Sequence, residues 1–110
     1  MRVTFSKLGR FGRLGNQMFQ IASTIGIATK NHASFGFPAW VDEISKKYVQ
    51  DYFKHPLPGV QRDKYQPLDV GFGYYDIRLE RSADISGYLQ SEGYFEHCTD
   101  LVRRYFTFKR

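Results

Sequence analysis

A glycine-rich basic segment near the amino terminus constrains the fold more than any other part of the chain. It follows a short apolar stretch at residues 2–5 and reads Gly9-Arg10-Phe11-Gly12-Arg13-Leu14-Gly15-Asn16-Gln17-Met18-Phe19-Gln20. A strand, a glycine-rich loop and a helix in this order bring ligands to the first amides of the helix. Those N–H groups have no acceptor within the helix, and the helix dipole favours negative charge there. The segment therefore predicts a β-α turn that forms half of a ligand site.

The residues after this turn predict a parallel β-α-β unit. Apolar side chains recur at helical spacing over 16–29, with Asn16 as the expected N-cap. Gly26 interrupts that pattern at a cost of about 1 kcal/mol relative to alanine, and the usual reason is close approach to a neighbouring strand. Asn31 is expected to be a left-handed C-cap before a second strand at 33–37. Right-handed crossovers join parallel strands, so the two strands should be parallel.

The rest of the chain predicts more α/β structure around a less regular middle. Residues 40–53 fit either a helix or a partly irregular segment under an aromatic cover, and 70–79 resemble interrupted strand material. Residues 85–89 predict a buried strand, followed by an amphipathic helix that begins at Ser91 and extends to Tyr105. We therefore predict an α/β fold: one Rossmann-like, three-layer domain over residues 1–110, with a mostly parallel sheet and flanking helices.

Composition narrows the classes of protein and of site. Sixteen Lys and Arg against eleven Asp and Glu give a net charge of +5, which suits phosphates, nucleic acid or an anionic membrane surface without choosing among them. A single cysteine excludes an internal disulfide and a cysteine-based zinc site, and the three histidines lack ligand spacing, so no metal is expected. No apolar run approaches the roughly 20 residues that span a bilayer. The expected location is cytoplasmic, with peripheral association with the inner membrane face left open.

The glycine-rich segment matches neither of two common phosphate-binding patterns. It lacks the Walker Gly-Lys-Ser/Thr, and its glycines are spaced by three, unlike the dinucleotide fingerprint. A turn remains in which Gly15 lets a ligand approach the backbone, Arg13 is a forked donor and Asn16 can donate and accept. The alternative, a plain β-α turn in which Asn16 only caps the helix, stays open on these grounds.

Two segments resemble a known family. The run from Gly12 to Gln20 resembles the N-terminal signature of the alpha-1,2-fucosyltransferases, glycosyltransferase family 11. The run Gly87-Tyr88-Leu89-Gln90-Ser91-Glu92-Gly93-Tyr94-Phe95 is similar to a later segment of that family, Gly-Tyr-Phe/Leu-Gln-Ser-x-x-Tyr-Phe. Both occur in the family's order, and with the elements between them the resemblance spans nearly the whole chain.

The resemblance implies a function and a set of site residues. Enzymes of this family have a GT-B-like architecture of two Rossmann-like halves. They transfer L-fucose from GDP-fucose to the 2-hydroxyl of a galactoside with inversion, and they require no metal or other cofactor. By resemblance the substrate and donor cleft is lined by Arg13, Gly15, Asn16 and Gln17, with Gly12, Gln90 and Ser91 as secondary candidates.

One departure from the family shapes the expectation for this chain. The family's His-x-Arg-Arg-x-Asp motif, which supplies the main arginine for the nucleotide sugar, comes just after the point where this chain ends. Arg103 and Arg104 are no substitute, because position 101 is Leu and position 106 is Phe. The resemblance thus implies an N-terminal domain without its C-terminal nucleotide-sugar-binding domain, inactive alone and with no certain catalytic residue. Self-association through a newly exposed surface is expected.

Two other functions stay open at the level of sequence. One is a non-catalytic α/β domain that binds a saccharide or a protein partner. The other is a small basic nucleic-acid-binding protein, which no recognised RNA- or DNA-binding pattern supports, so nucleic acid is not an expected partner. The expected partners are the nucleotide sugar and the galactoside glycan of the complete enzyme.

Overall fold

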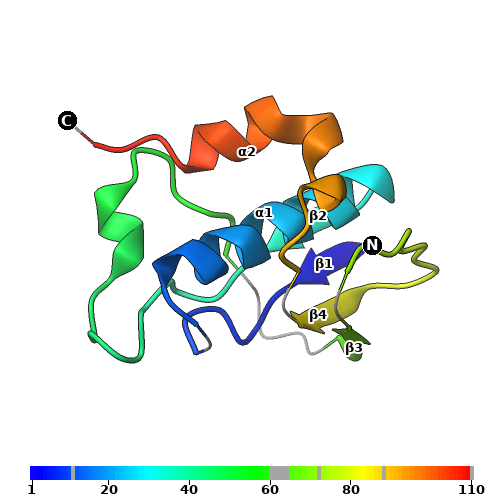
Figure 1. Cartoon of the computed structure of the whole chain (residues 1–110), viewed down its shortest axis with the longest axis horizontal. Coiled ribbons are helices and arrows are strands. Elements are labelled where there is room, and N and C mark those ends of the chain that lie inside the picture. Colours follow the sequence, from blue (N-terminus) through cyan, green and yellow to red (C-terminus); the bar gives the residue numbers. More distant parts are fainter. Residues whose placement is uncertain (11, 60–64, 72, 88, 110) are drawn as a thin grey trace.

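A four-stranded parallel sheet is the base of the fold in the computed structural model (Figure 1). The strand order is β2-β1-β4-β3, with bounds β1 (Arg2–Thr4), β2 (Ser34–Gly36), β3 (Gln66–Val70) and β4 (Ala83–Gly87). The structure describes residues 1–10, 12–59, 65–71, 73–87 and 89–109. The α/β class, the Rossmann-like parallel sheet and the flanking helices are as predicted from the sequence.

The helices divide into one long element and several short ones. Helix α1 (Leu14–Lys30) connects β1 to β2, which makes the predicted parallel β-α-β unit. The shorter elements are η1 (Val49–Tyr52), η2 (Glu92–Tyr94), η3 (Glu96–Cys98) and α2 (Thr99–Tyr105). Figure 1 shows α1 between the sheet and the carboxyl-terminal elements.

The sheet has one apolar and one polar face, which follows from the strand register. Val3 lies beside Phe35 and Ala83 on one face, where the core forms. The next residues along, Thr4 and Asp84, pair on the opposite face, because successive side chains alternate. Helix α1 packs on the apolar face, and η2, η3 and α2 lie on the side of α1 away from the sheet. The described residues thus stack in the order sheet, α1, carboxyl-terminal elements, with both α-helices on the same side of the sheet.

Helix α1 is buried on every side over residues 21–28. The sheet covers one side of it and η2 and η3 cover the other, where Phe19 packs edge-on against Phe95 with ring centroids 5.9 Å apart. A Cβ at Gly26 would lie 1.8 Å from the carbonyl oxygen of Tyr94. Gly26 thus permits the close backbone approach predicted from the sequence, but the neighbour is η2 and not a strand.

Both ends of α1 differ from the prediction. The helix begins at Leu14 with Arg13 as the N-cap residue, three positions before the expected N-cap, and the Asn16 side chain instead accepts a hydrogen bond from Gln90. At the other end Asn31 has φ −98°, and the left-handed residue is His32 with φ 55°. The Asn31 side chain donates to the carbonyl of Ile27, so it caps α1 through its amide and not through its backbone conformation.

The middle of the chain is mostly irregular, as one of the two sequence interpretations expected. Only η1 is helical within 40–53, and Trp40 stacks on Phe53 at 5.4 Å between ring centroids. The expected strand material beyond Val70 is absent from the described residues of 71–79. Its backbone is used differently, because Asn31 donates to the carbonyl of Ile77 and accepts from the N–H of Leu79.

The carboxyl-terminal third is also less regular than predicted. The strand begins at Ala83, two residues early, and Tyr88 lies outside the described residues. Ser91 is a cap as expected, since its hydroxyl accepts from the N–H of Gly93 at 3.3 Å. The single amphipathic helix is broken into η2, η3 and α2, with non-helical backbone at Phe95 (φ −132°). This break follows the segment whose backbone contacts Gly26.

Substituting Gly26 tests the role of this close contact. We predict that Gly26→Ala lowers the free energy of unfolding by about 1–3 kcal/mol despite the better helix propensity of alanine, because the added methyl group overlaps the Tyr94 carbonyl. The matched control is Gly15→Ala in the same helix, where a Cβ meets nothing within 4 Å. Urea unfolding of both variants measures the difference, and equal stabilities would contradict the packing argument.

Candidate functional site

The glycine-rich turn lies where the carboxyl end of β1 leads into α1. Ligands of open α/β sheets bind outside the carboxyl ends of the strands, so this is the expected position for a site. Gly12 has φ 72°, in the region that favours glycine, and a Cβ there would lie 2.7 Å from the Asn16 side-chain nitrogen. Gly12 is therefore required by the geometry of the turn itself. Phe11 lies outside the described residues.

The amino terminus of α1 is open and electropositive. The first intrahelical bond is from the N–H of Gln17 to the carbonyl of Arg13, at 3.0 Å. The N–H groups of residues 14–16 precede it and have no acceptor within the helix. The first turn holds no acidic side chain, and Arg13 is exposed beside it. These groups can donate hydrogen bonds to an anionic or hydroxyl-bearing ligand.

Gly15 is the position in this turn where a ligand has most room. It is exposed, nothing lies within 4 Å of a Cβ placed there, and it is not among the glycines with positive φ. Neither packing nor backbone conformation thus requires glycine at this position. The sequence predicted that Gly15 would let a ligand approach the backbone, and the open space around Gly15 agrees with this.

Asn16 joins the turn to the segment that follows β4. Its Oδ1 accepts a hydrogen bond from Gln90 Nε2 at 2.6 Å. β1 and β4 are neighbours in the sheet, which explains why residues 74 positions apart meet here. We call Gly12, Arg13, Gly15, Asn16 and Gln90 the α1 amino-terminal site.

Gln17 and Ser91 lie next to this site, and their side chains form hydrogen bonds that stabilise the fold. Gln17 is fully buried, and its Oε1 accepts from the indole N–H of Trp40 at 2.8 Å. Its Nε2 donates to the Gly12 carbonyl at 3.1 Å and to Asp42 at 3.4 Å. The Ser91 hydroxyl accepts from Gly93 as a cap. The structure therefore assigns both residues to holding the site in place and gives Gln17 no exposed atom for a ligand.

The sequence reasoning missed the Gln17–Trp40 hydrogen bond. One signal was present: Gln17 precedes Ile21 by four residues and so shares the buried side of α1. A polar side chain there needs a buried partner. The single tryptophan of the chain was an available candidate.

A loop at residues 41–48 is attached to the glycine-rich turn. The Gly9 carbonyl accepts from the N–H of Glu43 at 3.1 Å, and a Cβ at Gly9 would lie 2.0 Å from the carbonyl oxygen of Val41. Within the loop Asp42 accepts from the Ser45 hydroxyl at 2.8 Å and from the N–H of Ile44 at 3.3 Å. The Ser45 hydrogen bond is the main reason that the pKa of Asp42 is lowered.

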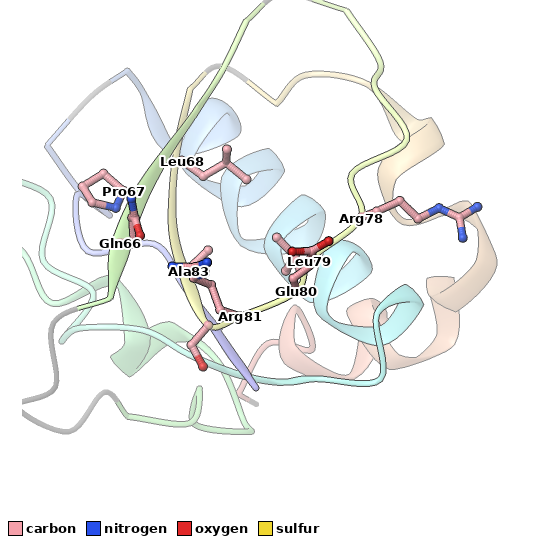
Figure 2. Close-up of a pocket in the computed structure, with 9 residues that line it drawn as sticks. Gln66, Pro67, Leu68, Arg78, Leu79, Glu80, Arg81 and Ala83 are labelled. Atoms are coloured by element: carbon pink, nitrogen blue, oxygen red, sulfur yellow. The ribbon is translucent and has the colours of Figure 1, made fainter.

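A separate pocket of about 430 Å³ lies at the amino ends of β3 and β4 (Figure 2). Its wall includes Leu68, Leu79 and Ala83, and Figure 2 shows Arg78 extending away from them. Arg78 is paired with Asp76 at 3.1 Å. Since ligands of open α/β sheets bind at the opposite strand ends, this pocket is a weaker candidate than the α1 amino-terminal site.

The remaining cysteine and paired arginines of the described residues do not add to the α1 amino-terminal site. No group of three or more His, Cys, Asp or Glu side chains there could hold a metal ion. Cys98 is half-buried, which raises the pKa of its thiol. Arg103 and Arg104 are exposed on α2. No helix among the described residues is both long and apolar enough to cross a membrane.

Comparisons with protein-family models, curated proteins and solved structures found no match to this chain. The family resemblance consequently rests on the two sequence segments described above. In the structure the two segments lie next to each other, joined by the Asn16–Gln90 hydrogen bond.

The Gln17–Trp40 pair yields a stability prediction. Gln17→Met keeps the approximate volume but leaves the Trp40 N–H buried without its acceptor, so we expect a loss of about 1–3 kcal/mol in unfolding free energy. Trp40→Phe in the same background removes the unpaired donor and should recover part of that loss. Urea unfolding of the two single variants and the double variant measures the coupling. Strictly additive losses would contradict the pairing.

The lowered pKa of Asp42 yields a pH prediction. A carboxyl whose pKa is lower when folded binds fewer protons in the folded state, so its contribution to stability is complete above the ordinary carboxyl pKa of about 3.9 and disappears as pH falls through the folded value. We predict that wild type exceeds Asp42→Asn in stability at pH 7 and that the gap closes as the pH falls through the lowered pKa of the folded state. Urea titrations at several pH values test this, and a gap independent of pH would contradict it.

Proposed function

We propose that this chain forms the N-terminal, cleft-lining domain of an inverting fucosyltransferase-like enzyme. The reaction would transfer L-fucose from GDP-fucose to the 2-hydroxyl of a galactoside. The observation that carries the proposal is the Asn16–Gln90 hydrogen bond of 2.6 Å. It joins the two segments that resemble the alpha-1,2-fucosyltransferases, although they are far apart in the sequence, at the strand ends where α/β proteins bind ligands.

The residues of the α1 amino-terminal site suit the needs of such a transfer. Negative charge develops on the diphosphate as it leaves, and preorganised amides with a forked guanidinium stabilise that charge without reorganising. Arg13 and the amides at Gly15 and Asn16 are the available donors. The Asn16–Gln90 pair offers amide groups that can orient a sugar hydroxyl. No step in this proposal requires a metal ion or other cofactor.

The proposal assigns only part of the transferase reaction to this domain. The nucleotide-sugar-binding half, GT-B-like in the family, would be supplied by a second domain, so transferase activity of these 110 residues alone is expected to be negligible. We place the protein in the cytoplasm, where nucleotide sugars are available, with peripheral contact to the inner membrane face as an option. Self-association of the separate domain and the absence of a nucleic-acid partner are further parts of the proposal.

Saccharide binding by the chain itself is the first test. We expect saturation-transfer NMR to show weak binding of lactose and weaker binding of GDP, because the proposal assigns most nucleotide contacts to a second domain. Gln90→Ala should lower lactose binding several-fold by removing one amide of the site. Gln66→Ala removes another exposed glutamine, at the pocket of Figure 2, and should change nothing. Equal effects of the two variants, or no saccharide binding, would favour a different function.

Transfer itself is tested in an enzyme where this sequence precedes a His-x-Arg-Arg-x-Asp segment. We predict that Asn16→Ala lowers kcat/KM by at least about tenfold, as expected when a positioning hydrogen bond is lost. The melting temperature should change little, because Asn16 is only half-buried at the helix end. Unchanged transfer would refute the assignment.

A further inference from the structure

A second pocket, distinct from the α1 amino-terminal site, lies between the glycine-rich turn and the 41–48 loop. Its volume is about 330 Å³, near the lower limit of pockets that hold small molecules. It is lined by Ser6, Leu8, Arg10, Pro38, Ala39, Val41, Glu43 and Lys46. The first three follow β1 and the next three follow β2, so the pocket lies at the carboxyl ends of two neighbouring parallel strands.

The charged side chains of this pocket favour an anion. Arg10 and Lys46 both line it, and Glu43 is the one acidic side chain among the lining residues. Arg10 Nε lies 3.7 Å from a Glu43 carboxylate oxygen, so this rim already accommodates one anionic oxygen. The contact is long, and both side chains are more than half exposed, so it is weak and replaceable. A phosphate group would bind Arg10 with better geometry, because a guanidinium can donate two parallel hydrogen bonds to it.

The backbone around the pocket is fixed in a way that suits binding. Lys46 has φ 60°, and its N–H donates to the Asp42 carbonyl at 2.7 Å, which closes a tight turn. Asp42 accepts a further hydrogen bond from Ser45 inside that turn. The Glu43–Gly9 hydrogen bond then joins the turn to the segment that carries Arg10. The two cationic residues thus lie on segments held together before a ligand arrives, which reduces the ordering cost of binding.

We propose that this pocket binds a phosphate group of a small phosphorylated molecule, with Arg10 and Lys46 as its cationic contacts. The inference goes beyond the proposed transferase function, because it uses none of Arg13, Gly15, Asn16 or Gln90. Leu8, Pro38 and Ala39 provide an apolar wall for the rest of the ligand. The volume limits that ligand to a compact monoester, and inorganic phosphate is its minimal probe.

Titration of the full chain with inorganic phosphate at low ionic strength tests the inference, with backbone NMR shifts as the readout. We expect saturable shifts at the amides of residues 8–10 and 43–46. Arg10→Gln and Lys46→Gln should each weaken binding about five- to tenfold, as for loss of a charged hydrogen-bond partner. Glu43→Gln should strengthen it about two- to fivefold by removing the competing carboxylate.

Two matched controls separate a site from a general charge effect. Lys47→Gln removes the neighbouring exposed charge of the same loop, and Arg104→Gln removes an exposed arginine of α2; neither residue lines the pocket. Both should bind phosphate within about twofold of wild type. Equal losses in all four neutralised variants, or no saturation at millimolar phosphate, would overturn the proposal. If a variant at Lys46 fails to fold, the gain predicted for Glu43→Gln decides the result. Gln90 does not line this pocket, so the effect of Gln90→Ala on saccharide binding tests the proposed function separately from the phosphate site.

Discussion

The burial of helix α1 on every side is the constraint on which the rest of the structure depends. A helix that packs on a sheet with its other face in water needs only an apolar stripe, whereas α1 must also fit closely under η2. Gly26 makes this possible, since any side chain there would occupy the position of the Tyr94 carbonyl. The carboxyl-terminal elements therefore lie on α1, and the segment after β4 reaches the beginning of the helix. This contact, together with the pairing of β1 and β4, places Gln90 next to Asn16.

The buried side chain of Gln17 is a second constraint, because it holds the glycine-rich turn in place. Gln17 uses both ends of its amide, one for the Trp40 indole and the other for the Gly12 carbonyl and Asp42. These contacts tie the turn to the aromatic core and to the 41–48 loop at a single buried point. The exposed donors of the turn are therefore held in place before a ligand binds. This reduces the conformational entropy that the site loses on binding. The turn is rigid because of residues that do not touch a ligand.

Local patterns in the sequence were enough for β1, α1, β2 and β4, because each has a clear period and clear turn residues around it. The errors occurred where a distant side chain decides local structure. Asn16 looks like an N-cap by type, but its side chain is bound by Gln90. The expected strand at 77–79 gives its backbone hydrogen bonds to Asn31. No single-sequence pattern reports either pairing.

Part of the candidate site could be predicted from the sequence, and part of it could not. The glycine-rich turn was identified from its spacing, and Gly15 has the open surroundings expected of it. Gln17 was grouped with the ligand-facing residues through the family resemblance, although a helix turns about 100° per residue and so points this side chain into the core. The pocket with Arg10 and Lys46 depends on how two loops meet, which requires the three-dimensional structure.

The central claim is that ligands of the transferase reaction meet this chain at the amino terminus of α1. The most direct measurement is a backbone ¹⁵N NMR titration of the chain with lactose and, separately, with GDP-fucose. The account predicts that the largest shifts lie at the amides of Gly15, Asn16 and Gln90. Largest shifts around the pocket of Figure 2, or no shifts at millimolar ligand, would contradict it.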